Sequence, residues 1–250
     1  EVTAEMINGA LDKIRARGVT DNTIRHHVIS LRAFFQWTVD QGLVEDNPVR
    51  GLTAPVPEKY TDAGFYTPQE VRELLRAVEG TVSELPVNLA LYLGLRRSEV
   101  AGLRWQDVDL ENNKITIQHK VVQYVDAGGK YKIEASDKMK TQSSRRVLPI
   151  PAQLKETLSS TADKTGLVCK GRFGQPLTPD EISQAFQRTL TLAGLRHIRF
   201  HDLRHTCASL LLAAGASMKE VQVILGHSNF ATTADIYSHV DLRGKEAALN

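Results

Sequence analysis

The sequence HDLRHT at residues 201–206, followed by LGH at 225–227 and then by Tyr237, determines how the rest of the chain is interpreted. It places a guanidinium, several imidazoles and a phenol near the ends of what the pattern predicts to be short helices. His201 and Arg204 lie three residues apart, so both side chains are expected on one face of a helix start. A helix N-terminus favours anions through its free N–H groups and its dipole. Together these groups suit the handling of a phosphodiester.

The composition is that of an ordinary soluble globular protein. The chain has 250 residues, of which 42% are hydrophobic and 24% charged, enough for one large domain or two smaller ones. No apolar run approaches the roughly 18 residues of a membrane span, and no secretory signal is visible, although a chain that does not begin with Met can be a fragment. The two cysteines, Cys169 and Cys207, lack C-x-x-C spacing, which fits a reducing cytosol and argues against a thiolate metal site.

The basic character of the chain is local. A net charge of +2 is too small to indicate a nucleic-acid binder by itself. Residues 138–146, however, contain only positive charges among their ionisable side chains, and residues 188–205 contain arginines and histidines with a single Asp. These two segments are the candidates for anion binding.

The N-terminal part is predicted to be a small helical bundle. Residues 3–17 have helical composition, and a second helix is expected at about 23–41, with Thr23 as its cap and Gly42 as its stop. A proline-rich piece up to Gly64 then predicts an extended linker. We expect a helical DNA-binding domain at 1–58, a linker at 59–65 and a catalytic domain with a C-terminal tail at 66–250.

The second domain is predicted to be mainly α with a small antiparallel β-sheet, an α+β fold. Capping boxes at 67–70, 178–181 and 217–220 predict three helix starts, and apolar runs predict helices at 87–93, 97–103 and 203–214. A period of two at 115–117, 121–125, 131–133 and 145–150 predicts one antiparallel sheet of about three strands. Gly129-Lys130 is not a phosphate loop, because Tyr124 occupies the position of the required first glycine.

Each candidate residue of the second domain has an ordinary explanation when taken alone. Arg96 can be a surface arginine paired with Glu99, and Lys140 a solvated loop lysine. The glycine before His227 can simply end a helix, and Tyr237 can be a half-buried aromatic. Their order is more specific: GLRxSE at 94–99, KTxxSxRxxP at 140–149, HDLRHT at 201–206, LGH at 225–227 and Tyr237 in YSH at 237–239.

In this order the second domain closely resembles the tyrosine recombinase, or phage-type integrase, family. The N-terminal bundle resembles the family's core-binding domain only in position and helicity. The resemblance implies a nucleophile, Tyr237, that ends covalently attached to a DNA 3′-phosphate, and two arginines, Arg96 and Arg204, that bind the scissile phosphate. It also implies that His201 and His227 orient that phosphate, that Lys140 protonates the leaving 5′-oxygen and that Glu99 positions Arg96. His205 is interpreted as a packing or supporting residue.

The resemblance also implies the partners. We expect double-stranded DNA recombination sites, a homotetramer on DNA that exchanges strands through a Holliday junction, and accessory DNA-bending proteins as possible helpers. Both domains would close around the duplex as a clamp, mainly through phosphate contacts. We expect neither metal nor other cofactor, no membrane partner, and a cytoplasmic, nucleoid-associated location in a bacterium or a phage-infected host.

Three alternatives remain open at this stage. A metal-dependent phosphohydrolase would use His201, Asp202, His205 and Asp235 as ligands, although arginine is an unusual neighbour for such a site. A non-catalytic DNA-binding relative would occupy sites without cutting them, and a type IB topoisomerase would share the chemistry. The sequence does not identify the target site, the direction of the reaction, or a phage, transposon or chromosomal role.

Overall fold

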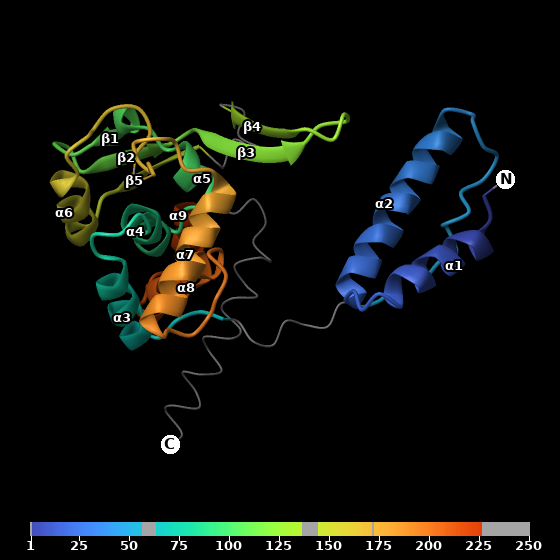
Figure 1. Ribbon diagram of the computed structural model, residues 1–250, viewed down its shortest axis with the longest axis horizontal. Coiled ribbons are helices and arrows are strands. Elements are labelled where there is room, and N and C mark those ends of the chain that lie inside the picture. The colour runs from blue at the N-terminus through green and yellow to red at the C-terminus, as the bar shows by residue number, and fades with distance from the viewer. Residues whose placement is uncertain (1, 57–63, 137–144, 172, 227–250) are drawn as a thin grey trace, which may run out of the picture. The chain divides into compact units, whose positions relative to one another are not determined.

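The computed structural model describes residues 2–56, 64–136, 145–171 and 173–226. The chain divides into two compact units, Glu1–Asp62 and Ala63–Asn250 (Figure 1). The predicted linker at 59–65 spans this division, and its residues 59–63 lie outside the described residues. In the described parts of the chain, no helix combines the length and the apolar character needed to cross a membrane.

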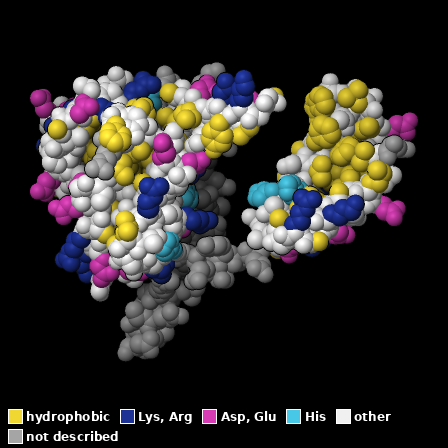
Figure 2. All heavy atoms as spheres, viewed as in Figure 1, with side chains coloured by type: hydrophobic (Ala, Val, Ile, Leu, Met, Phe, Trp, Pro, Cys, Tyr) yellow, Lys and Arg dark blue, Asp and Glu magenta, His cyan; other side chains and the backbone are white. Residues whose placement is uncertain are grey.

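The first unit consists of two helices, α1 (Ala4–Arg15) and α2 (Asp21–Asp40), and a following segment that packs on them. Its small core contains residues of both helices and Val49. The predicted cap was wrong: Thr20, not Thr23, caps α2, and its side chain accepts a hydrogen bond from the backbone N–H of Thr23. Hydrophobic side chains also gather on the viewed surface of this unit (Figure 2). Among the exposed hydrophobic residues of α2 are Phe34 and Trp37.

The second unit is mainly helical. Its helices are α3 (Pro68–Val78), α4 (Glu84–Leu93), α5 (Arg97–Gly102), α6 (Ala152–Ser160), α7 (Pro179–Ala193), α8 (Asp202–Ala213) and α9 (Met218–Leu225), with a 3-10 turn at Trp105–Asp107. Helix α4 lies in the middle, packed against α3, α5, α6 and α8 (Figure 1). The three predicted capping boxes are present, at the starts of α3, α7 and α9.

The strands form two sheets, not the single sheet that was predicted. One sheet has the order β1 (Val108–Asp109), β2 (Lys114–Ile117), β5 (Arg146–Pro149), with Ile117 paired to Arg146. The other is a separate hairpin of β3 (Lys120–Val125) and β4 (Tyr131–Ser136). Strand β2 therefore pairs past the hairpin with β5, which places Arg146 at the edge of the helical core.

Two helix ends meet at the centre of the second unit. Gly94 ends α4 in the left-handed region, with a φ of 60°, and a Cβ at this position would collide with the side chain of Leu225 at the end of α9. Glycine is therefore required here both for its backbone conformation and for the close approach. The C-terminal ends of α4 and α9 are held together at the point where the candidate residues gather.

Candidate anion-binding site at the end of α9

Arg96 is fixed at the start of α5. Its backbone N–H donates to Oε2 of Glu99 at 3.0 Å, and its Nη1 donates to Oε1 of the same carboxylate at 2.8 Å. Its Nη2 donates to the carbonyl of Gly226 at 2.8 Å. The side chain of Glu99 is 2% exposed and that of Arg96 is 33% exposed. The pair is thus not an ordinary surface ion pair, and Arg96 keeps an edge that a ligand can reach.

Arg204 lies inside the core near the first turn of α8. The residue is 1% exposed, and it donates to the carbonyl of Gly94 at 2.5 Å and to that of Leu225 at 2.7 Å. Burial, followed by the neighbouring charge of Arg96, lowers the pKa of Arg204 to about 9. The guanidinium therefore stays charged at neutral pH. Two of its five N–H donors are used on the two carbonyls, so the guanidinium retains donors for a ligand.

Arg146 is the third guanidinium of the site and is buried like that of Arg204. It belongs to the KTxxSxRxxP motif, but the sequence alone predicted no role for it. Its Nε donates to the carbonyl of Ile224 at 2.7 Å. Its Nη1 and Nη2 donate to the two oxygens of Glu99 at 3.2 and 3.0 Å. Only tertiary structure assigns it a place, because the spacing of the motif does not show which helix end Arg146 reaches.

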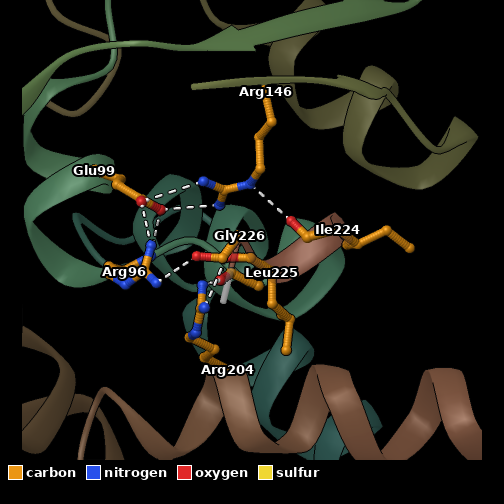
Figure 3. Close-up of polar contacts among 8 residues, drawn as sticks. Arg96, Glu99, Arg146, Arg204, Ile224, Leu225 and Gly226 are labelled. Carbon is orange, nitrogen blue, oxygen red and sulfur yellow. Dashed lines mark hydrogen bonds and ion pairs between the residues drawn. The ribbon is translucent and has the colours of Figure 1, made fainter. Parts of the chain in front are cut away.

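The three guanidiniums bind three consecutive carbonyls at the end of α9 (Figure 3). Arg146 contacts Ile224, Arg204 contacts Leu225 and Arg96 contacts Gly226. The last carbonyls of a helix lack partners within the helix and form the negative end of its dipole, so they stabilise cations. Among the described residues, these three positive charges face one carboxylate, that of Glu99, so positive charge is in excess within this group. This excess suits an anionic ligand with several oxygens.

Glu99 holds two of these arginines and gives the site a pH dependence. Burial alone would raise its pKa, but hydrogen bonds and charge from Arg146, and then the charge of Arg96, lower the pKa below its ordinary value of 4.5. Because the folded-state pKa is the lower one, the stabilisation is present above the unfolded-state pKa. It is lost as the pH falls through the folded-state pKa.

A Glu99→Gln protein is therefore expected to be less stable at neutral pH, on the order of 3 kcal/mol, because Arg146 loses its buried counter-ion. The difference from wild type should shrink as the pH falls below 4.5, where the unfolded-state carboxyl takes up protons, and should shrink further as the pH falls through the lower folded-state pKa of Glu99. Denaturant unfolding between pH 7 and pH 3 measures this, with the exposed Glu111→Gln as the matched control. A constant difference over that range would contradict the assignment of the ionised carboxylate.

The start of α8 places His201 beside His205. The two rings meet edge to face with centroids 5.1 Å apart, which fits the supporting role expected of His205. Burial, followed by the charges of His205 and Arg204, lowers the pKa of His201 to about 4, so its imidazole is neutral at neutral pH. The carboxylate of Asp202 accepts hydrogen bonds from Arg199 at 2.7 and 3.1 Å.

The metal-dependent alternative would need His201, Asp202 and His205 as ligands. Within the described residues, no group of three or more His, Cys, Asp or Glu side chains is arranged to hold a metal ion.

The structure brings together three of the predicted site residues, Arg96, Glu99 and Arg204. Lys140, His227 and Tyr237 lie outside the described residues; Lys140 falls between β4 and β5, and His227 directly follows Gly226.

The three guanidiniums at one helix end of a mainly helical unit form a cationic site suited to an anion with several oxygens, such as a phosphate ester. Residues 65–243 match the phage integrase family, and the chain belongs to that family. It is a tyrosine recombinase, an enzyme that acts on DNA. The predictions of family, of fold class and of enzyme class are thereby confirmed.

Relatives of known name agree with this membership. The chain is 29% identical to a XerC-like tyrosine recombinase of Caldanaerobacter subterraneus over 95% of this chain and 67% of the relative. It is also 29% identical to the tyrosine recombinase XerC of Thermodesulfovibrio yellowstonii, over 95% of this chain and 78% of that protein.

Solved structures share the fold. The integrase of transposon Tn1549, in complex with a circular intermediate DNA, is 23% identical with a TM-score of 0.77, over 100% of this chain and 86% of that one. The lambda integrase tetramer bound to a Holliday junction is 19% identical with a TM-score of 0.70, over 92% of this chain and 65% of that one. At these identities the likeness shows the architecture alone.

Proposed function

We propose that this chain cuts and rejoins DNA strands at specific recombination sites through a covalent 3′-phosphotyrosyl intermediate formed by Tyr237. The observation that carries the proposal is the binding of Arg96, Arg146 and Arg204 to three consecutive carbonyls at the end of α9. The helix end that the three arginines hold directly precedes His227 in the sequence. The arginines concentrate positive charge at the place where a phosphate would be held.

In this proposal the arginines supply the electrostatic part of catalysis. Arg96 and Arg204 bind the two non-bridging oxygens of the scissile phosphate. The pentacoordinate transition state carries more charge on those oxygens than the ground state does, so prearranged guanidiniums stabilise it preferentially. Their fixed contacts to Glu99 and to the helix-end carbonyls mean that little reorganisation is needed during the reaction.

The remaining residues supply proton transfer and the nucleophile. The Tyr237 oxygen attacks phosphorus and passes its proton to His201 or His227, while the bond to the 5′-oxygen breaks and Lys140 gives that oxygen a proton. His201 and His227 orient the phosphate and assist the proton transfer. The phosphotyrosyl bond conserves the energy of the broken linkage, so a 5′-hydroxyl of another strand can reverse the step without ATP.

We further propose a homotetramer on two DNA sites that passes through a Holliday junction. Support comes from the lambda integrase, which was solved as a tetramer bound to a Holliday junction and shares the fold. Exchange, as opposed to simple resealing, needs a 5′-hydroxyl from a partner duplex at each phosphotyrosyl bond. Two duplexes with two cleaved strands each therefore need four protomers. We also propose accessory DNA-bending proteins as helpers.

The experiment that tests the proposal uses a pool of nicked duplexes with a randomised central sequence, incubated with the protein in EDTA. Nicks let the 5′-hydroxyl fragment diffuse away, so the covalent complex accumulates. We expect SDS-resistant adducts whose peptide maps to Tyr237 and whose DNA shares one sequence, the recombination site. Cleavage that requires a divalent metal, or an adduct on another residue, would overturn the mechanism.

A further inference from the structure

We propose that Arg146 is a positioning residue for strand cleavage: it holds Glu99 and the end of α9 in the arrangement that directs Arg96 at the scissile phosphate. This inference rests on the proposed function and adds to it a residue outside the set expected to touch DNA. Arg146 acts through its neighbours and not through the substrate.

All three nitrogens of the Arg146 guanidinium have defined partners. Nη1 and Nη2 form a fork on the two oxygens of Glu99, and Nε donates to the carbonyl of Ile224 in the last turn of α9. A planar guanidinium fixes the directions of its donors relative to one another. Arg146 therefore sets the position of the Glu99 carboxylate in α5 relative to the end of α9.

Glu99 transmits this position to Arg96. The same two carboxylate oxygens that accept from Arg146 also accept from Nη1 and from the backbone N–H of Arg96. Arg96 also donates to the carbonyl of Gly226, two residues after Ile224, whose carbonyl accepts from Arg146. Both arginines therefore contact Glu99 and the end of α9. As Figure 3 shows, Arg146 and Arg96 approach Glu99 and the helix end from different elements.

The partners of their donors separate the roles of Arg146 and Arg96. Burial alone does not distinguish the roles, because Arg204, which is expected to bind the phosphate, is 1% exposed. All three nitrogens of Arg146 donate to protein oxygens, and its side chain is 5% exposed. The side chain of Arg96 is 33% exposed, so a phosphate can approach Arg96, and Arg146 orients Arg96 through Glu99. Lysine cannot replace this function, since an ammonium is a point charge that lacks the planar fork.

The test compares Arg146→Met and Arg146→Lys with wild type on two nicked duplexes of the selected site. One duplex has a normal scissile phosphodiester, and the other has a methylphosphonate there, which is electrically neutral. If Arg146 orients Arg96 for charge stabilisation, adduct formation on the phosphodiester falls on the order of 10- to 100-fold, as displaced catalytic groups cause. The deficit should be much smaller on the neutral linkage, which needs less charge stabilisation.

Three controls make the outcome decisive. Arg72→Met removes an exposed arginine on α3, outside the two basic segments, and should leave the ratio of rates on the two substrates unchanged. DNA affinity and thermal unfolding show whether each variant is folded and bound, and if Arg146→Met does not fold, the ratio for Arg146→Lys decides. Equal deficits on both substrates, or none, would overturn the inference. A wild-type protein that forms no adduct would instead refute the proposed function itself.

Discussion

A Tyr237→Phe protein is expected to bind recombination-site DNA with wild-type affinity and to form no covalent adduct with it. The substitution removes one oxygen, the proposed nucleophile, and leaves the arginine cluster at the end of α9 in place. Binding depends mainly on phosphate contacts by cationic groups, which the change does not touch. Adduct formation should fall below detection, because in this mechanism the 3′-phosphate can be held covalently only by that oxygen.

The measurement is a pair of assays on the same nicked duplex. Electrophoretic mobility shift reports binding, and SDS-resistant complexes report covalent attachment. Tyr131→Phe is the matched control, because Tyr131 is an exposed tyrosine on β4 whose hydroxyl donates to Asp180 at 2.9 Å, and it should form adducts at the wild-type rate. An undiminished adduct in Tyr237→Phe would mean that another side chain attacks.

Local signals in the sequence predicted the helix starts of the second unit well. In a capping box the residues that bond to each other lie three positions apart, so Thr67 with Glu70, Thr178 with Glu181 and Ser217 with Glu220 could be identified without any tertiary information. The predicted start of α2, in the first unit, was wrong because the local sequence offers two possible caps. Thr20 and Thr23 are both suitable caps, and the sequence pattern alone did not decide between them.

Nonlocal pairing was the part that the sequence could not predict. The alternation of apolar residues indicated strands, but it did not show that β2 pairs with β5 while β3 and β4 form a hairpin of their own. The same pairing carries Arg146 to Glu99 and to the end of α9. The contacts of Arg146 therefore became clear only with the fold, whereas the association of Arg96 and Arg204 was already implied by the resemblance to the family's motifs.

The arrangement also explains how like charges can be kept together in a folded protein. Each guanidinium is held by a carbonyl at the negative end of a helix dipole, and Glu99 neutralises only part of the charge. Burial is the main cause of the lowered pKa of Arg204, and the charges of Arg96 and Arg146 add to it. A bound phosphate would offset these charges, and it would do so more strongly in the transition state, where the phosphate oxygens carry more charge.

Arg204→Lys is expected to slow cleavage on the order of 100- to 1,000-fold, the loss typical of removing a donor aimed at a developing charge. Lysine keeps a positive charge but cannot bond the carbonyls of Gly94 and Leu225 and still present a fork to the phosphate. Stability should decrease by about 1 to 3 kcal/mol, because a buried carbonyl loses its donor. The rate loss corresponds to about 2.7 to 4 kcal/mol of transition-state stabilisation. Because this range overlaps the expected loss of stability, thermal unfolding and DNA affinity are measured alongside the rate to separate the two effects.

The Arg204→Lys protein should also acquire a pH dependence that wild type lacks. Burial and the charge of Arg96 lower the pKa of Arg204 to about 9, which leaves an arginine protonated at neutral pH. A lysine has an ordinary pKa of about 10.4, and the same surroundings would lower that pKa toward neutral pH. Its charge is then lost as the pH rises, so the deficit in single-turnover adduct formation should grow between pH 6 and pH 8.5 relative to wild type. The matched control is Arg72→Lys, a change at an exposed arginine on α3 outside the two basic segments. A deficit that is independent of pH would show that the fork geometry alone, and not the retained charge, makes Arg204 necessary, and a variant as fast as wild type would remove Arg204 from the site.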